Sequence, residues 1–253
     1  MTTAAKHTFT QSRLRLTYCL FLIAAAVLAP AKIDAAEAME SSYQAELPCN
    51  PFSLVTESFD GVTPPALPSG WSSTTWVTSN SGVPMPSADT PPNAAFVDDP
   101  ATISDKQLLS PNITLICDQG GVGISFRNNF NFQDGFDGGV LEVSYDGGLT
   151  FQDVLAAGGT FVRGGYNGTI NSCCGNPLAG RQAWTGNSAG FIDTTVVSLP
   201  GGCITLNHLV VRWRMGSDSS VSGEGWRIDN VNIVGCPRPV RQNPFPRPRP
   251  TPR

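Results

Sequence analysis

The sequence predicts an all-β sandwich of two antiparallel sheets. Apolar residues recur in short runs that are alternating or β-branched, and no stretch has the spacing of an amphipathic helix. Glycine, proline, asparagine and aspartate separate these runs at intervals that are typical of sandwich strands. Roughly 190 residues lie between Cys49 and Cys236, which is enough chain for one sizeable core.

Alternation in Leu209–Met215 shows how the strands are predicted. Four apolar residues share one parity, and Arg212 and Arg214 share the other. Because successive side chains of a strand point to opposite faces, this strand should bury its apolar face and expose its arginines to water. In chain order, the predicted strands are Leu54–Phe59, Trp71–Val77, Ala94–Val97, Gln107–Leu109, Val122–Arg127, Val140–Tyr145, Gly159–Arg163, Thr194–Leu199, Leu209–Met215 and Trp226–Val234.

The last predicted strand breaks its own alternation. Trp226 and Ile228 fall on one parity, whereas Val231 and Ile233 fall on the other. A β-bulge at Asp229-Asn230 would place both pairs on the same face, and bulges re-aim the side chains beside them. We therefore predict a bulge there, with Asp229 as a polar residue of interest.

Both ends of the chain differ from the predicted sandwich. Residues 1–36 have the order of a secretory signal peptide: a basic leader, an apolar run of about 13 residues and then small residues. The run is too short for a membrane span, so we expect a protein that is secreted or held at the cell surface by other means. Residues 37–48 form a short linker before the domain at 49–236. The tail at 237–253 alternates proline and arginine, which predicts an extended segment without a core.

Charge is distributed unevenly. From Glu37 to Cys236 there are 19 acidic and 7 basic residues, a net charge of −12, whereas the tail has five arginines and no acid. An acidic body argues against nucleic acid as a partner and is compatible with calcium. The basic tail could contact anionic polymers of the cell envelope, or it could be a solvated spacer.

Six cysteines follow the leader, and an even number on an export route favours disulfides. They are Cys49, Cys117, Cys173, Cys174, Cys203 and Cys236. We prefer Cys49–Cys236, which would join the ends of the folded region, and then Cys117–Cys203. The adjacent Cys173 and Cys174 either bond to each other or each bond elsewhere. A zinc site is disfavoured because one histidine follows the leader and no Cys-x-x-Cys is repeated.

Several segments resemble MAM-like and cleaved-adhesin domains. The segment Glu57–Gly61 followed by Leu67–Trp71 is similar to their opening, and residues 136–144 and 176–181 are similar to their middle. Gly225–Val231 resembles their closing strand, in which a second aspartate is commoner than Asn230. The resemblance covers most of residues 50–235. It implies a jelly-roll β-sandwich of the kind found in surface proteins and beside extracellular proteases, where such a domain binds or stabilises and does not catalyse.

Calcium is the cofactor that the sequence favours, in a structural role. Glu57 and Asp60 on the first strand would meet Asp229 on the last if the Cys49–Cys236 pairing joins those strands. Asp98, or its neighbour Asp99, would complete the set of oxygen ligands that calcium requires. Jelly rolls that this chain resembles often carry such an ion. The alternative is that these residues are ordinary solvated acids of loops.

The long loop from Gly164 to Gly190 is the candidate for ligand binding. It contains Tyr166, Arg181, Trp184 and Asn187. Aromatic rings and guanidinium groups on loops of a rigid sandwich can stack on sugars or peptides. The alternative is that Trp184 packs under its own loop and that Arg181 pairs with a neighbouring acid.

Catalytic candidates are few. His208 is the one histidine after the leader, and the sequence has no His-Glu-x-x-His. A glycosidase needs only two carboxylates beside a cleft, for which Glu142 and Glu224 are the candidates.

The sequence thus predicts a secreted domain for non-catalytic adhesion or recognition of an extracellular glycan or protein. One alternative is a secreted glycan- or peptide-cleaving hydrolase or its accessory domain, and another is an envelope protein anchored by its tail. Two close carboxylates with raised pKa values in a cleft would favour the hydrolase. An exposed aromatic patch on the loops would favour binding.

Overall fold

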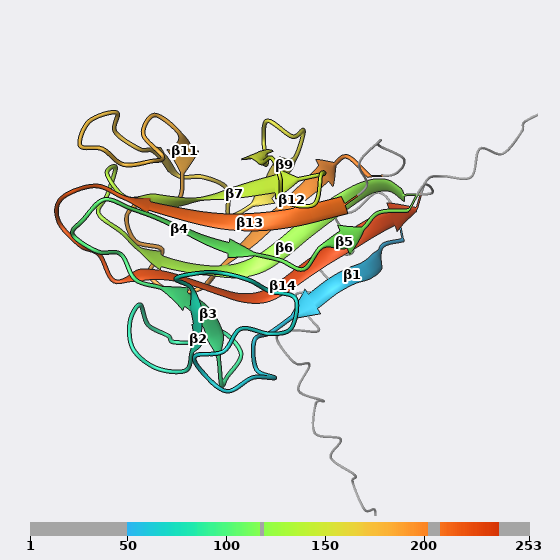
Figure 1. Ribbon diagram of the computed structural model, residues 1–253, viewed down its shortest axis with the longest axis horizontal. Helices are drawn as coiled ribbons and strands as arrows, with labels where there is room; N and C mark the ends of the chain where they lie inside the picture. Colours follow the sequence, from blue (N-terminus) through green and yellow to red (C-terminus); the bar gives the residue numbers. More distant parts are fainter. Residues whose placement is uncertain (1–49, 117–118, 202–207, 238–253) are drawn as a thin grey trace, which may run out of the picture. The chain divides into compact units, whose positions relative to one another are not determined.

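The computed structural model describes residues 50–116, 119–201 and 208–237. Within these residues the chain is all-β with no helix, and two antiparallel sheets pack face to face (Figure 1). The predicted jelly-roll β-sandwich is confirmed. The signal peptide, the linker and the tail beyond Pro237 lie outside the described residues, so those assignments stay predictions. No helix in the described part of the chain has the length and apolar character of a membrane span.

The first sheet has seven strands and the second has five. The first contains β1 (Phe52–Glu57), β2 (Val77–Ser79), β3 (Ala94–Val97), β6 (Gln119–Asn131), β9 (Thr160–Arg163), β12 (Ile192–Leu199) and β14 (Gly225–Pro237). The second contains β4 (Ser104–Leu109), β5 (Ile113–Thr114), β7 (Gly138–Ser144), β8 (Gln152–Asp153) and β13 (His208–Ser217). A small two-stranded sheet is formed by β10 (Gly168–Thr169) and β11 (Gln182–Ala183).

Strand β13 lies between β4 and β7 and shows the predicted alternation. Its four apolar side chains, Leu209, Val211, Trp213 and Met215, are fully buried. Arg212 and Arg214 point to the opposite face and are half-buried. The arginines therefore lie on the outer face of the second sheet, as period-two alternation requires.

Strand β14 lies between β3 and β6 in the first sheet, and its predicted bulge is confirmed. Its register with β6 shifts between Asp229 and Asn232, and Asn230 has a positive φ of 48°. The shift buries Trp226 and Ile228 together with Val231 and Ile233. It also turns the carboxyl group of Asp229 towards the loop before β3, where it accepts hydrogen bonds from backbone N–H groups.

Aromatic rings fill the space between the two sheets. Trp213 stacks on Trp71 with ring centroids 5.6 Å apart, and Trp226 lies 5.8 Å from Trp184. Gly139 on β7 makes this packing feasible, because a Cβ atom there would lie 2.5 Å from the Trp226 ring. Trp213 and Trp226, which lie on predicted strands, are both buried.

The strand predicted at Trp71–Val77 is wrong over most of its length. Strand β2 begins only at Val77, and the residues before it form a loop in which Ser72 makes a single bridge to Leu109. The Ser73 hydroxyl accepts hydrogen bonds from the backbone N–H groups of Thr75 and Trp76, so these groups do not pair with a neighbouring strand. The two-residue strands β5, β8, β10 and β11 were not predicted, since runs of two residues carry no periodic signal.

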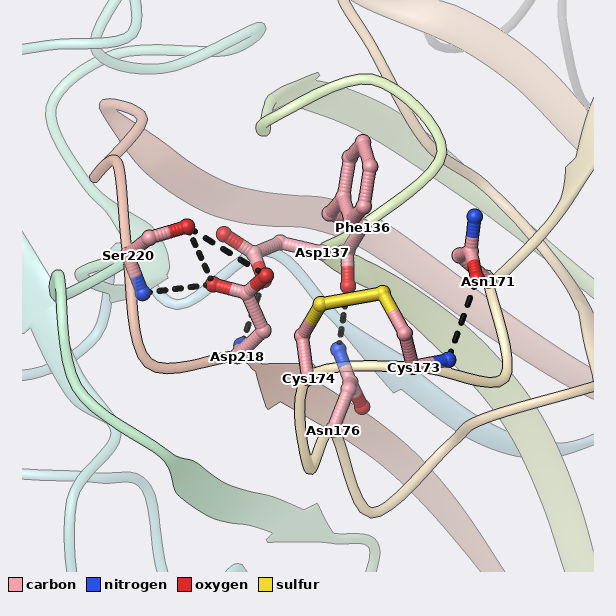
Figure 2. The surroundings of a disulfide bond; sticks show 8 residues. All are labelled: Phe136, Asp137, Asn171, Cys173, Cys174, Asn176, Asp218 and Ser220. Atoms are coloured by element: carbon pink, nitrogen blue, oxygen red, sulfur yellow. Dashed lines mark hydrogen bonds between the residues drawn. A yellow bond between two sulfur atoms is a disulfide. The ribbon is translucent and has the colours of Figure 1, made fainter.

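Cys173 and Cys174 bond to each other, so the vicinal alternative holds (Figure 2). Cys236 is also disulfide-bonded. Cys49, Cys117 and Cys203 lie outside the described residues, and the pairings Cys49–Cys236 and Cys117–Cys203 stay predictions.

Candidate functional site

The outer face of the second sheet carries a network of charged and polar side chains, which we call the charged sheet face. Strand pairing sets its geometry, since Arg212 lies opposite Glu142 on β7 and Arg214 lies opposite Gln107 on β4. The members are Asp105, Gln107, Glu142, Asp153, Arg181, Arg212 and Arg214.

Glu142 is the centre of this network. Its side chain is 4% exposed, and its carboxylate lies 2.5 Å from Arg181, 2.5 Å from Arg212 and 3.6 Å from Arg214. A carboxylate that is buried this deeply requires such partners, because removing an unpaired charge from water is costly. The arginines thus hold the Glu142 side chain in place.

Arg181 joins the long loop from Gly164 to Gly190 to the sheet. Its guanidinium group binds Glu142 through one nitrogen and Asp153 on β8 through another, at 2.8 Å. Arg181 therefore pairs with neighbouring acids, which is the alternative that the sequence left open.

The edge of the network near β4 is more accessible. Arg214 donates two hydrogen bonds to Asp105, at 2.7 and 2.8 Å, and the Asp105 side chain is 35% exposed. The side-chain oxygen of Gln107 accepts a hydrogen bond from Arg212 at 3.0 Å. A hollow of about 370 Å³ opens beside them, which is within the size range of small-ligand sites. It is lined by Ser72, Ser73, Thr74, Asp105, Gln107 and Leu109.

A second hollow of about 270 Å³ lies near the other edge of this sheet. It is lined by Val143, Tyr145, Asp146, Thr150, Phe151 and Gln152. The guanidinium carbon of Arg212 lies 3.7 Å from the centre of the Phe151 ring, in cation–π contact. Arg212 thus connects the two hollows through the network.

Trp184 is not available to a ligand, which corrects one sequence prediction. Its side chain is 0% exposed, its Nε1 donates to the carbonyl of Gly164 at 2.8 Å, and its ring contacts Phe161 and Tyr166. The ring is large enough to fill the space under its own loop, which is where burial of its apolar surface is most favourable.

Tyr166 and Asn187 are also separate from any common ligand site. The Tyr166 hydroxyl binds the backbone of Leu141 and the Asp153 carboxylate, and burial raises its pKa well above the usual range. Asn187 is exposed and its side chain caps the N–H of Ala189. Of the four predicted ligand residues, Arg181 belongs to the charged sheet face, and Tyr166 contacts that face only through Asp153 from a buried position.

The predicted calcium ligands do not converge as a set. Strands β1 and β14 pair as expected, but Glu57 accepts from the N–H of Phe59 and Asp60 accepts from the N–H of Asn93. Asp98 forms an ion pair with Lys106 at 2.6 Å. In the described ranges, no group of three or more His, Cys, Asp and Glu side chains is arranged to hold a metal ion. Calcium stays a prediction.

Asp229 is fully buried and is satisfied by the backbone. Its two carboxylate oxygens accept hydrogen bonds from the N–H groups of Asp89, Thr90 and Asn230, at 2.7–3.1 Å. Burial nevertheless raises its pKa to about 7, with a smaller contribution from the nearby charge of Asp60. Its place at the bulge was predicted correctly, and its role in holding the loop before β3 was not.

The hydrolase candidates do not form a catalytic pair. Glu142 is held by arginines, whereas Glu224 is exposed in the loop before β14. His208 is exposed at the start of β13. These positions supply no two free carboxylates beside one cleft, which the mechanism requires.

A close pair of acids with raised pKa values exists elsewhere. Burial raises the pKa of Asp99 to about 7 and that of Asp137 to about 6, and the negative charges of Asp137 and Asp218 add to these respective shifts. The pair is 3% and 0% exposed, so it is in the interior and not in a cleft. No sequence pattern predicted that Asp99, Asp137 and Asp218 lie close together, because they come from three separate turns.

No known family model matches this chain, and no curated protein matches it. Among solved structures it is similar to a carbohydrate-binding module, TmCBM61, in complex with beta-1,4-galactotriose, with 12% identity, a TM-score of 0.40 and coverage of 65% of this chain and 88% of that one. It is also similar to the K1 cleaved adhesin domain of Lys-gingipain from Porphyromonas gingivalis W83 (16% identity, TM-score 0.39, coverage 71% and 96%). A cyclase from Fischerella sp. TAU is similar at 16% identity, with a TM-score of 0.39 and coverage of 75% and 99%. Likeness at this level assigns no function to this chain.

Proposed function

We propose that this protein is a secreted or cell-surface recognition domain that binds an extracellular glycan or protein without catalysis. The observation that carries the proposal is the accessible edge of the charged sheet face. There Asp105 and Gln107 line a hollow of about 370 Å³, and Arg214 on the paired strand binds Asp105.

The chemistry of this edge suits hydroxyl and amide groups. Asp105 offers acceptor oxygens, Arg214 offers donors, and the Gln107 amide offers both. Because strands β4 and β13 are hydrogen-bonded to each other, these groups are held in place before a ligand arrives, which lowers the entropy cost of binding. A hollow of this size suits one sugar unit or one side chain of a longer ligand.

The hydrolase alternative lacks supporting geometry, since the acidic groups of this face are ion-paired. Glu142 and Asp153 share Arg181, and Asp105 is paired with Arg214. A catalytic carboxyl group has to reach the substrate, whereas these carboxyl groups are already bound to guanidinium groups. The tail-anchoring alternative depends on residues outside the described part of the chain and stays a prediction.

Glycan and protein arrays probed with the secreted form of the protein test the proposal. We expect Gln107→Ala to weaken binding of the captured ligand at least about tenfold, because it removes a hydrogen-bonding group at the hollow. Arg214→Ala should have a similar effect, because it releases the Asp105 carboxylate that Arg214 holds at the hollow. Gln182→Ala is the matched control, since Gln182 is exposed on β11 in the small two-stranded sheet. Dissociation constants from biolayer interferometry give the comparison.

Two outcomes would contradict the proposal. Equal affinity of all three variants would show that the ligand binds elsewhere on the domain. Turnover of an array glycan by the wild-type protein would replace recognition by hydrolysis.

A further inference from the structure

Strand β4 is an edge strand of the second sheet, and one of its two sides is largely unpaired. Its whole length pairs with β13. On the other side, the described residues supply a single isolated bridge, from Ser72 to Leu109. The hollow of about 370 Å³ is lined by Asp105, Gln107 and Leu109 of β4 and by residues 72–74. It therefore lies along this edge of the sheet.

The direction of the free backbone groups follows from the alternation of an antiparallel ladder. The N–H of Leu109 donates to the carbonyl of Ser72 at 2.9 Å, and the carbonyl of Leu109 accepts from the N–H of Ser72 at 3.1 Å. Both backbone groups of Leu109 thus point away from β13. Every second residue of a strand directs these groups to the same side, so those of Gln107 and Asp105 also point away from β13.

Contacts on the β13 side agree with this assignment. The carbonyl of Val211 on β13 accepts from the N–H of Ser110 at 2.9 Å, so Val211 faces β4. By alternation Trp213 also faces β4, and it lies opposite Leu108. The ladder is therefore closed through Leu108 and its alternates. Within the described contacts, the intervening residues of β4 keep free backbone groups at the edge, except where Ser72 pairs with Leu109.

A buried tryptophan explains why the neighbouring segment leaves this edge. Trp76 is 2% exposed and contacts Trp226 of the first sheet, with ring centroids 5.3 Å apart. Ser72 still pairs with β4, so the chain has to turn from the second sheet towards the first between residues 72 and 76. The Ser73 hydroxyl stabilises this turn by accepting two backbone N–H groups. The hollow is the space that the turn leaves beside β4.

On the basis of the proposed recognition function, we infer that the ligand of this edge is an extended peptide segment of another protein. The segment pairs with β4 as an additional antiparallel strand, in the direction that Ser72 already takes. Its alternating N–H and C=O groups match the free groups of Gln107 and Asp105 in spacing and in kind. Such a ladder requires a polypeptide, so protein is favoured over glycan as the partner.

The length of the free edge limits the length of this segment. Ser72 already covers Leu109, and β4 begins at Ser104, so the free stretch is Ser104–Leu108. Five residues of extended chain span about 17 Å. A short extended segment of the partner is therefore sufficient, and no second folded domain has to approach the sheet.

Charge specifies the segment further. The Asp105 carboxylate is 35% exposed, and its partner Arg214 is 20% exposed. A side chain directly opposite Asp105 in the added strand lies on the same face of the sheet, so a lysine or arginine there would contact this carboxylate. The 19 acidic and 7 basic residues from Glu37 to Cys236 give a net charge of −12, which also attracts a basic partner. The expected ligand is a basic segment in an extended conformation.

An immobilised array of random ten-residue peptides, probed with the secreted full chain, tests the inference. We expect the retained peptides to be rich in lysine, arginine and β-branched residues. They should be poor in aspartate and glutamate, and poor in proline, which has no N–H for a ladder. The peptide that is retained most tightly, called the selected peptide, is then synthesised. Asp105→Asn should weaken its binding about threefold or more, because the variant lacks the charge that faces the peptide.

Proline at position 107 separates the backbone from the side chain. Gln107→Ala removes only the side chain, whereas Gln107→Pro also removes the N–H that points to the peptide. We expect the proline variant to bind the selected peptide about tenfold more weakly than the alanine variant, its matched control. Since this N–H does not bond to β13, the two variants should have similar melting temperatures.

Chemical modification of the peptide gives a second test, which does not depend on the folding of a variant. The selected peptide is synthesised with one N-methyl group at each position in turn. Only every second N–H of an added strand points to β4. N-methylation should therefore weaken binding about tenfold at alternate positions and leave it unchanged at the positions between them.

Three results would overturn the inference. If the array retains no peptide while a glycan binds and Gln107→Ala weakens that binding, strand addition is wrong and the recognition function stands. Equal affinities of the alanine and proline variants, with N-methyl effects that lack a two-residue repeat, would mean that side chains alone hold the peptide. Self-association of the full chain that Gln107→Pro abolishes would place a second copy of this protein at the edge. If neither array retains the protein, the proposed function fails as well.

Discussion

The charged sheet face and the buried pair of Asp99 and Asp137 place carboxyl groups in two opposite environments. On the sheet face, the buried carboxylate of Glu142 is surrounded by Arg181, Arg212 and Arg214. Asp99 and Asp137 are at least as deeply buried as Glu142. In the described part of the chain, however, no ion pair joins either of them to a cationic side chain. Burial raises the pKa values of both acids, and the negative charge of a neighbouring aspartate adds to each shift.

The comparison distinguishes buried carboxylates that are paired with arginines from buried carboxyl groups that have no cationic partner. A fully paired network fixes strands and loops and needs nothing further. A buried carboxyl pair without a cationic partner is instead neutralised by a proton, as the raised pKa values of Asp99 and Asp137 indicate. This is why we assign recognition of a large ligand to the open edge of the charged sheet face.

Removing the central carboxylate should give the largest effect. In Glu142→Ala, three guanidinium groups lose their shared partner while remaining largely buried, which should lower the free energy of unfolding by about 3 kcal/mol. For a domain of this size, the melting temperature should fall by about 6–12 °C. Chemical denaturation and calorimetry provide the measurements.

The conservative variant Glu142→Gln sharpens this test. Glutamine keeps the size and an acceptor oxygen but removes the charge, so most of the loss should persist. A loss below about 1 kcal/mol in both variants would mean that the network is solvated like a surface ion pair.

Asp229 is an intermediate case. It is a buried acid that accepts hydrogen bonds from the backbone, and within the described residues no ion pair joins it to a cationic side chain. Its folded pKa of about 7 lies above the ordinary value near 3.8, so its protonation stabilises the folded state at low pH. That stabilisation is complete below about pH 4 and is lost as the pH rises through about 7. We expect the wild type to lose stability between about pH 5 and pH 8, and Asp229→Asn to lose about 2 kcal/mol less over that range.

Denaturant unfolding in chelator at both pH values measures this difference. Asp134→Asn serves as the control, since Asp134 is exposed and its variant should follow the wild-type slope. An Asp229→Asn slope identical to that of the wild type would contradict the raised pKa.

The smallest effect is expected at the accessible edge. Asp105→Ala removes the partner of Arg214 where the carboxylate is 35% exposed, so stability should change by less than about 1 kcal/mol. Its effect should appear in ligand affinity instead. A stability loss as large as that of Glu142→Ala would erase the distinction between the edge and the centre of the charged sheet face.

Local pattern predicted much of the fold because the relevant physics is local. The alternation around Trp213 identified both the core face and the arginine face of β13, and the parity change beside Asp229 identified the bulge. The same reasoning failed at Trp71–Val77, where Ser73 satisfies backbone donors and ends any strand. It also misjudged Trp184, since a loop tryptophan carries no periodic signal of its burial.

By itself, the sequence determined the all-β class, the principal strands, the faces of β13 and the bulge in β14, because each depends on neighbours a few residues apart. Only the tertiary structure decided that Asp99 and Asp137 meet, that Arg181 reaches Glu142, and that Trp184 is buried. Those contacts join positions tens of residues apart in the chain. The order of strands within and between two sheets sets such contacts, and period-two alternation is the same for many such orders.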